Sequence, residues 1–148
     1  MSVFLKNSAE RNKSRVKAEQ NLINKARKLD TINSYSVSNL GFLFSIENKK
    51  SKRVLAKRGD TVEIQYKIED LYRNLLYDED EIQIFKFIVD KEEVIPGLRE
   101  GVKFLSEGET GVFLFPSHFC YGYRGDFEKI GPNQPLRFTI KLVSLSYN

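Results

Sequence analysis

Apolar and polar residues alternate along much of the chain after Gly59. In residues 61–68 (TVEIQYKI) the apolar side chains occupy every second position, which is the period of a strand with one buried face. Residues 85–89, 112–114 and 136–142 alternate in the same way. These segments predict an antiparallel sheet with a single apolar face.

One internal segment has the spacing of a helix instead. Leu98, Val102 and Leu105 lie at positions i, i+4 and i+7, so they fall on one side of a helix that Gly97 opens and Gly108 ends. Because no other internal segment has this spacing, we expect a single helix to cover the apolar face. The predicted class is α+β: a strongly curved antiparallel sheet wrapped as a half-barrel around one short helix, preceded by an N-terminal helix.

The N-terminal part of the chain predicts a separate helix over residues 8–30. This segment has few helix breakers, and its apolar side chains form one narrow stripe. The residues of the stripe are Leu22, Ile23, Ala26 and Leu29. A stripe this narrow does not stabilise an isolated helix. We therefore expect it to pack on the body of its own chain, which we favour and which makes the protein a monomer, or on a second copy in a dimer.

Charge divides the chain at about the same place. Residues 1–58 contain 14 Lys and Arg against 4 Asp and Glu, whereas residues 59–148 contain 10 against 16. We interpret residues 1–39 as a basic helical arm and residues 40–148, which begin with the strand segment LGFLFSI, as the folded domain. The arm is suited either to an anionic membrane surface or to the acidic domain of its own chain. Nucleic acid is disfavoured as a partner, because the basic residues are not interleaved with aromatic residues that stack on bases.

Several classes of protein and site are disfavoured by composition. No apolar run reaches the roughly 20 residues that a membrane-spanning helix needs, and the N-terminus lacks the apolar stretch of a signal peptide. The single Cys120 rules out an internal disulfide. His118 and Cys120 share one loop, but two ligands do not complete a tetrahedral metal site, and the pair does not make an activated nucleophile. We expect no metal site and no cofactor.

Four motifs together resemble a known family. The segments KRGDTVEIQY, VIPGLREGVKFLSEGE, PSHFCYG and PLRFTIKLVSL occur in the order and at the separations of FKBP-type peptidyl-prolyl cis/trans isomerases. The resemblance covers a core of residues 57–147. The preceding helix, Asp30 and the segment SNLGFLFSI resemble the gliding-motility-associated lipoprotein branch of that family in Bacteroidetes-type bacteria.

The chemistry of such a family explains the residue types. Rotation about an X–Pro bond has a barrier of about 18–20 kcal/mol, because amide resonance is lost at the perpendicular geometry. The twisted amide is less charge-separated than the planar one, so a dry apolar pocket favours it without a nucleophile, metal or cofactor.

The resemblance also implies which residues form the site. The implied catalytic residues are Asp78, Tyr121 and Tyr66. The implied substrate-binding residues are Tyr77, Phe85, Val94, Ile95, Leu98, Ile130 and Phe138. In this scheme Asp78 accepts a hydrogen bond from Tyr66, and the Ile95 N–H and the Tyr121 hydroxyl donate to substrate carbonyls. In this scheme the side chains of Val94 and Ile95 form one wall of the pocket, and the Ile95 N–H is free to bind substrate. Both lie directly before the turn that starts the helix.

Two departures from the family pattern concern the pocket. Leu98 stands where the best-known members have a large indole, and the chain contains no Trp. The loop between Asp78 and Phe85 is two residues shorter than in common small members. These differences affect the expected rate and inhibitor affinity more than the fold.

The expected function is a peptidyl-prolyl isomerase that catalyses protein folding in the bacterial cell envelope or periplasm. Its partners are then proline-containing peptides and unfolded clients, with a macrolide as inhibitor. The resemblance implies a lipoprotein anchor outside this segment, and a cytoplasmic location stays open. The alternative is a non-catalytic module that binds proline loops and is tethered by the basic arm. The presence of both Asp78 and Tyr121 favours the enzyme.

Overall fold

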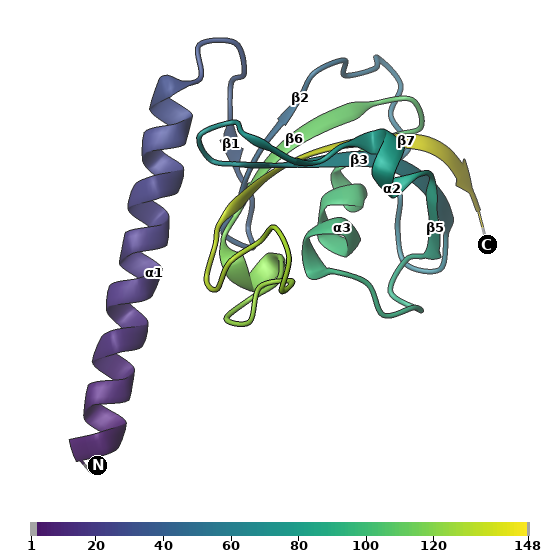
Figure 1. Cartoon of the computed structure of the whole chain (residues 1–148). Coiled ribbons are helices and arrows are strands. Elements are labelled where there is room, and N and C mark those ends of the chain that lie inside the picture. The colour runs from purple at the N-terminus through teal and green to yellow at the C-terminus, as the bar shows by residue number, and fades with distance from the viewer. Residues whose placement is uncertain (1–2, 148) are drawn as a thin grey trace.

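The computed structural model describes residues 3–147 of the chain, shown in Figure 1. Within them, seven antiparallel strands form one sheet in the order β1-β2-β6-β7-β3-β4, with β5 paired to β3. The strands are β1 (Ser36–Val37), β2 (Leu43–Ile46), β3 (Thr61–Asp70), β4 (Leu75–Tyr77), β5 (Phe85–Ile88), β6 (Thr110–Phe115) and β7 (Leu136–Ser146). The helices are α1 (Val3–Leu29), α2 (Glu79–Ile82) and α3 (Pro96–Gly101), with the 3-10 helices η1 (Val102–Phe104) and η2 (Ser117–Phe119). None of the helices in this part of the chain is long and apolar enough to cross a membrane.

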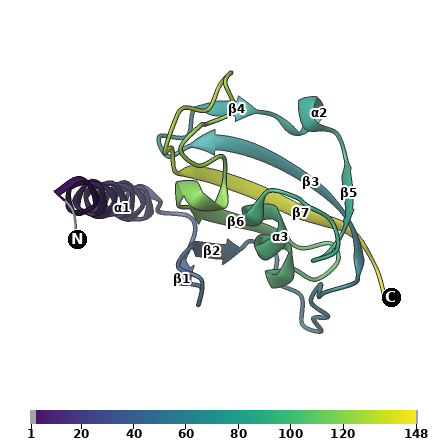
Figure 2. The ribbon, with the colours of Figure 1, turned by 90° about the horizontal axis from the view of Figure 1, so that it is seen from below.

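Strands β3 and β7 form the centre of the sheet. They pair from Thr61 opposite Ser146 to Asp70 opposite Leu136, and Figure 2 shows them running side by side across the molecule. Over residues 61–68 the side chains alternate strictly between half-buried and buried. The strand predicted from the alternating sequence is therefore confirmed.

Helices α3 and η1 cover one face of this sheet. Leu98, Val102 and Leu105 are at most 1% exposed, so the predicted apolar side of the helix is confirmed. The regular α-helix ends at Gly101 and continues as the 3-10 helix η1, which makes it shorter than predicted. A Cβ atom at Gly101 would lie 3.3 Å from the Ile140 Cδ1 atom, so a glycine here lets the helix approach the sheet closely.

The prediction of a single internal helix is wrong, because residues Glu79–Ile82 form the additional helix α2. Asp78 caps this turn: its carboxylate accepts a hydrogen bond from the Glu79 N–H at 2.9 Å, and Glu81 accepts one from the Asp78 N–H at 3.2 Å. Acidic residues throughout the first turn also interact favourably with the helix dipole. A one-turn helix has no apolar period, so the hydrophobic pattern did not reveal it.

Helix α1 lies on the side of the sheet away from α3, as Figure 1 shows. In β6, Phe113 and Phe115 belong to the core beneath α3, whereas Val112 and Leu114 join Ile23 of α1 in a second apolar cluster. All four of these β6 side chains are at most 1% exposed. The prediction of a single apolar face is therefore wrong for this strand, which is buried on both faces.

The predicted apolar stripe of α1 is only partly used. Ile23 is 6% exposed, but Leu29 is 69% exposed. Two carboxylates are buried instead: Glu19 on the helix is 7% exposed, and Asp30, just after it, pairs with Arg137 of β7 at 3.1 Å. The helix therefore packs on the body of its own chain through a short apolar patch and buried polar contacts.

Candidate active site

The residues predicted to form the site come from several segments and gather at one core. Tyr66 lies on β3, Phe85 on β5, Leu98 on α3 and Phe138 on β7. The rings of Tyr66 and Phe138 are stacked, with centroids 6.0 Å apart and an interplanar angle of 9°. Every predicted site residue except Asp78 belongs to this core cluster or packs directly against it. These residues are Tyr66, Tyr77, Phe85, Val94, Ile95, Leu98, Tyr121, Ile130 and Phe138.

Exposure separates these residues into a floor and a rim. Leu98, Ile130 and Phe138 are 1%, 3% and 0% exposed. The half-buried residues of the rim are Tyr77, Phe85, Val94, Ile95 and Tyr121. Buried apolar residues packed with half-buried aromatic and aliphatic side chains suit an apolar group of a ligand.

The segment before α3 leaves one backbone donor free. Ile95 is the N-cap residue of α3, and Pro96 follows it in the first turn. The Ile95 carbonyl accepts hydrogen bonds from the N–H groups of Leu98 at 3.0 Å and Arg99 at 3.1 Å. Within the described chain the N–H of Ile95 itself donates to no protein group. It is therefore available to a carbonyl of a bound ligand.

Tyr121 lies in a tight turn that follows η2. The Ser117 carbonyl accepts hydrogen bonds from the N–H groups of Cys120 at 2.9 Å and Gly122 at 3.0 Å, on either side of Tyr121. Burial raises the pKa of the Tyr121 hydroxyl, and the nearby charge of Asp126 raises it further. The hydroxyl is therefore protonated at neutral pH and can donate a hydrogen bond.

The predicted hydrogen bond from Tyr66 to Asp78 is wrong for this structure. No hydrogen bond joins these two side chains within residues 3–147, and the Asp78 carboxylate instead caps α2. Hydrogen bonding with Glu79 lowers the pKa of Asp78, so it is ionised at neutral pH. The sequence YDEDE contains its own N-cap signal, and that local signal holds the carboxylate.

A contact that the sequence did not reveal joins Tyr77 to the long loop after Tyr121. The Tyr77 hydroxyl donates a hydrogen bond to Asp126, which raises the pKa of Tyr77. Lys129 of the same loop lies 4.7 Å from the centre of the Tyr77 ring and pairs with Glu81 of α2 at 3.2 Å. The loop is thus fastened to β4 and α2 at the rim of the cluster.

Asp126 also shapes this loop. Its Oδ1 atom accepts hydrogen bonds from the N–H groups of Glu128, Lys129 and Ile130 at 3.0, 3.0 and 2.8 Å. Burial alone would raise the pKa of Asp126, but these bonds and the one from Tyr77 lower it below its ordinary value. The turn brings Ile130 down over the core. An Asp that folds the following residues around its carboxylate is a turn signal that sequence reasoning could have used here.

The pair His118 and Cys120 is divided between surface and interior. His118 is exposed and its ring lies 4.5 Å from that of Phe119. Cys120 is buried, and burial raises the pKa of its thiol, which makes it a poor nucleophile. Among the described residues, no group of three or more His, Cys, Asp and Glu side chains is placed to hold a metal ion.

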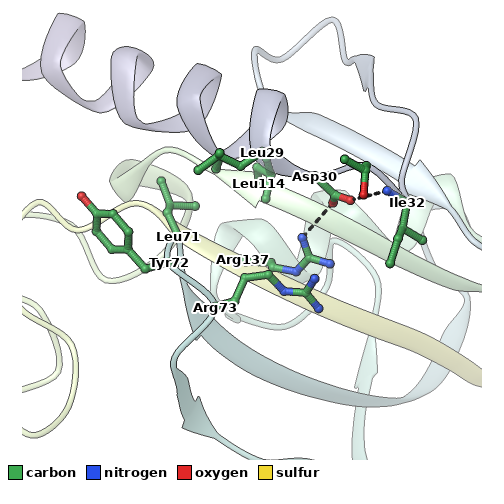
Figure 3. A pocket seen from close by; sticks show the side chains of 10 residues that line it. Leu29, Asp30, Ile32, Leu71, Tyr72, Arg73, Leu114 and Arg137 are labelled. Atoms are coloured by element: carbon green, nitrogen blue, oxygen red, sulfur yellow. Dashed lines mark hydrogen bonds and ion pairs between the residues drawn. The ribbon is translucent and has the colours of Figure 1, made fainter.

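A cavity of about 270 Å³ lies elsewhere, between the end of α1 and the turn after β3. Figure 3 shows the ion pair of Asp30 and Arg137 among its lining residues, together with Leu29 from α1 and Tyr72 from the turn. None of the described residues that line it belongs to the set predicted from the sequence. The cavity is therefore separate from the predicted site.

Comparisons with known proteins point to one family. Residues 52–143 match the family model described as FKBP-type peptidyl-prolyl cis-trans isomerase. Peptidyl-prolyl cis-trans isomerase FKBP1A of Xenopus laevis is 35% identical over 95 residues, which cover 63% of this chain and 87% of that protein. A probable FKBP-type isomerase, FkpA of Neisseria meningitidis serogroup B, is 47% identical over 53 residues, 36% of this chain.

Solved structures share the fold over nearly the whole chain. The crystal structure of FkpA from Escherichia coli superposes with a TM-score of 0.72 at 23% identity, covering 95% of this chain and 64% of that one. The chain spans only 20% of the Neisseria protein's length. The match of the family model to residues 52–143, more than half of the chain, decides the assignment. The chain belongs to the FKBP-type peptidyl-prolyl cis-trans isomerase family.

Proposed function

We propose that this chain accelerates cis/trans isomerisation of prolyl bonds in other proteins and so acts as a folding catalyst. The observation that carries the proposal is the convergence of the predicted floor and rim residues on one apolar cluster beside the free N–H of Ile95. Its substrates are proline-containing peptides and unfolded client proteins. FK506-type macrolides are the inhibitors it is proposed to bind, as the names of several relatives indicate for those proteins.

In the proposed mechanism the proline ring enters between Tyr66, Phe85 and Phe138 above Leu98. The Ile95 N–H and the Tyr121 hydroxyl donate hydrogen bonds to carbonyls that flank the rotating bond. These donors hold the neighbouring peptide units while the apolar walls exclude water. The twisted amide is less charge-separated than the planar amide, so it loses less on leaving water. No covalent step is required.

Asp78 has a smaller role in this proposal than the family resemblance implied. Its ionised carboxylate caps α2 and lies next to Tyr77, so it supports the rim and contributes a negative charge there. The ring of Tyr77 is held in turn by Asp126 and Lys129 of the long loop. We propose that these contacts define the side of the pocket that receives the residue before proline.

A second candidate function is the binding of proline loops without useful turnover. The position of Asp78 favours it, because the carboxylate is engaged with α2 rather than with Tyr66. In this reading the basic arm tethers the module to a membrane surface or partner. Turnover measurements distinguish the two candidates directly.

We propose the bacterial cell envelope as the setting. Support comes from the resemblance of the N-terminal segment to the gliding-motility-associated lipoprotein branch and from the bacterial origin of the two FkpA relatives. Fractionation of the native host, with detection of this chain in envelope and cytoplasmic fractions, tests the location. Recovery in the cytoplasm alone would contradict it.

The activity itself is tested with proline tetrapeptides that differ only in the residue before proline, assayed with and without FK506. Because the rim is aromatic and aliphatic, we expect Leu and Phe before proline to be turned over faster than Glu, and FK506 to inhibit. Equal rates across the series would contradict a pocket of this composition. FK506 binding without turnover of any peptide would favour the binding module.

A further inference from the structure

Helix α1 makes one buried, charged contact beside the proposed site. The Glu19 carboxylate accepts hydrogen bonds from both the N–H and the hydroxyl of Ser117, each at 2.7 Å. Glu19 is 7% exposed and Ser117 is 4% exposed. A hydrogen bond to an ionised group is stronger and more directional than one between neutral groups, so this contact fixes the start of η2 relative to α1.

Ser117 also holds the turn that carries Tyr121. Its carbonyl accepts hydrogen bonds from the N–H groups of Cys120 and Gly122, which flank Tyr121 in the chain. All three polar groups of Ser117 are therefore engaged: the N–H and hydroxyl with Glu19, and the carbonyl with the Tyr121 turn. One residue thus links the N-terminal helix to a proposed substrate-binding hydroxyl.

The opposite side of η2 is packed against the start of α3. A Cβ atom at Gly97 would lie 2.9 Å from the Phe119 carbonyl oxygen and 2.8 Å from the Phe115 ring. The backbone at Gly97 therefore lies so close to Phe119 and Phe115 that there is no space for a side chain. With Glu19 on one side and Gly97 on the other, η2 has little freedom to shift unless one of these contacts is broken.

We propose that Glu19 is a positioning residue for the isomerase site: by holding Ser117, it fixes the turn that aims the Tyr121 hydroxyl. This inference rests on the proposed function for its effect on turnover, but its structural part concerns only the placement of Tyr121. Through Glu19, the N-terminal helix then contributes to a site whose other residues lie far from it in the sequence. Glu19 touches no substrate and acts through Ser117.

The test uses the full chain with the substitutions Glu19→Ala and Glu19→Gln. Glu10→Ala is the matched control, because it removes the same charge from an exposed position of the same helix. Glu19→Ala should lower kcat/KM on the best proline tetrapeptide by roughly two- to tenfold, the range expected for loss of one hydrogen bond from Tyr121. Glu19→Gln keeps an acceptor for Ser117 and should recover most of the loss, and Glu10→Ala should have no effect.

A double-mutant cycle separates positioning from general destabilisation. If Glu19 acts through Tyr121, then Glu19→Ala should cause no further loss of kcat/KM in a Tyr121→Phe background. An equal loss in both backgrounds would overturn the proposal. If Glu19→Ala does not fold, Ser117→Ala, which removes only the hydroxyl contact, replaces it in the same cycle. Unchanged kcat/KM for Ser117→Ala in both backgrounds would then overturn it.

An NMR readout keeps this test distinct from that of the proposed function. The ring signals of Tyr121 should shift or broaden in Glu19→Ala, or in Ser117→Ala, and stay unchanged in Glu10→Ala. Unchanged Tyr121 signals would overturn the positioning role whatever the activity. A chain that turns over no peptide but shows the Tyr121 shift would instead contradict the proposed function and retain the contact between helix and turn.

Discussion

The two faces of the sheet are held by different kinds of contact. On the α3 face, Leu98, Phe115 and Phe138 pack together, each at most 1% exposed. On the α1 face a smaller apolar cluster is accompanied by Glu19 and Asp30, whose carboxylates make directed hydrogen bonds to other segments. Apolar burial is strong but non-directional, whereas a bonded carboxylate fixes position and depends on ionisation. The α3 face therefore supplies most of the apolar burial and carries the residues of the proposed pocket, and the α1 face sets the position of the helix.

The largest expected effect belongs to the α3 face. Phe138→Ala should lower the free energy of unfolding by about 3–5 kcal/mol, because it deletes a fully buried ring, and it should also reduce peptide turnover. Urea unfolding of the whole chain measures the first effect. Phe127→Ala, which changes a residue that is 84% exposed, is the control. If Phe138→Ala lowers turnover without lowering the free energy of unfolding, then Phe138 does not support both the core and the proposed pocket.

The α1 face should instead respond to pH. Burial alone would raise the pKa of Asp30, but the hydrogen bonds from Asn33 and Tyr35 hold it well below its ordinary value. A depressed folded pKa means that the stability from Asp30 is complete above the unfolded pKa of about 4 and is lost as pH falls below it. Asp30→Asn should therefore cost roughly 1–3 kcal/mol at pH 7, because Arg137 keeps Glu69 but loses the closer of its two carboxylate partners.

Melting temperatures across pH check this prediction. The difference between the unmodified chain and Asp30→Asn should be largest near neutral pH and should shrink as pH falls below about 4. Glu10→Gln, on the exposed side of α1, should show no such trend. If the difference in melting temperature between the two proteins does not change with pH, Asp30 stabilises the fold by packing and neutral hydrogen bonds rather than by its charge.

The smallest expected effect lies at the rim, where Asp78 combines a capping contact with a charge. Asp78→Ala should lower stability by about 1 kcal/mol, because it removes the N-cap of α2, whereas Asp78→Asn retains a good cap and should cost a few tenths. If the charge matters for turnover, both variants should be slower. If only the cap matters, Asp78→Asn should turn over peptide at the unmodified rate. Thermal melts and the tetrapeptide assay together separate these outcomes.

Sequence reasoning succeeded where a residue's partner was the apolar core. Tyr66, Leu98 and Phe138 could be assigned to one cluster because period-2 strands and a period-3.6 helix each expose one apolar side, and those sides have to meet. It failed for Asp78, whose carboxylate has a local partner in α2. It also missed the hydrogen bond from Tyr77 to Asp126, because nothing in the order of residues relates that loop to Tyr77.

The sequence by itself determined the strands with alternating apolar residues and the apolar side of the helix that covers them, because each depends on a local period of hydrophobicity. The roles of the site residues were implied by the family resemblance and stay a prediction. Only the tertiary structure decided how α1 is attached. The stripe containing Leu29 pointed to apolar docking, yet that residue is exposed while Glu19 and Asp30 are anchored to Ser117 and Arg137. These pairs lie 98 and 107 residues apart in the chain. A buried carboxylate needs a specific distant donor, and its position is fixed only when the fold brings that donor to it.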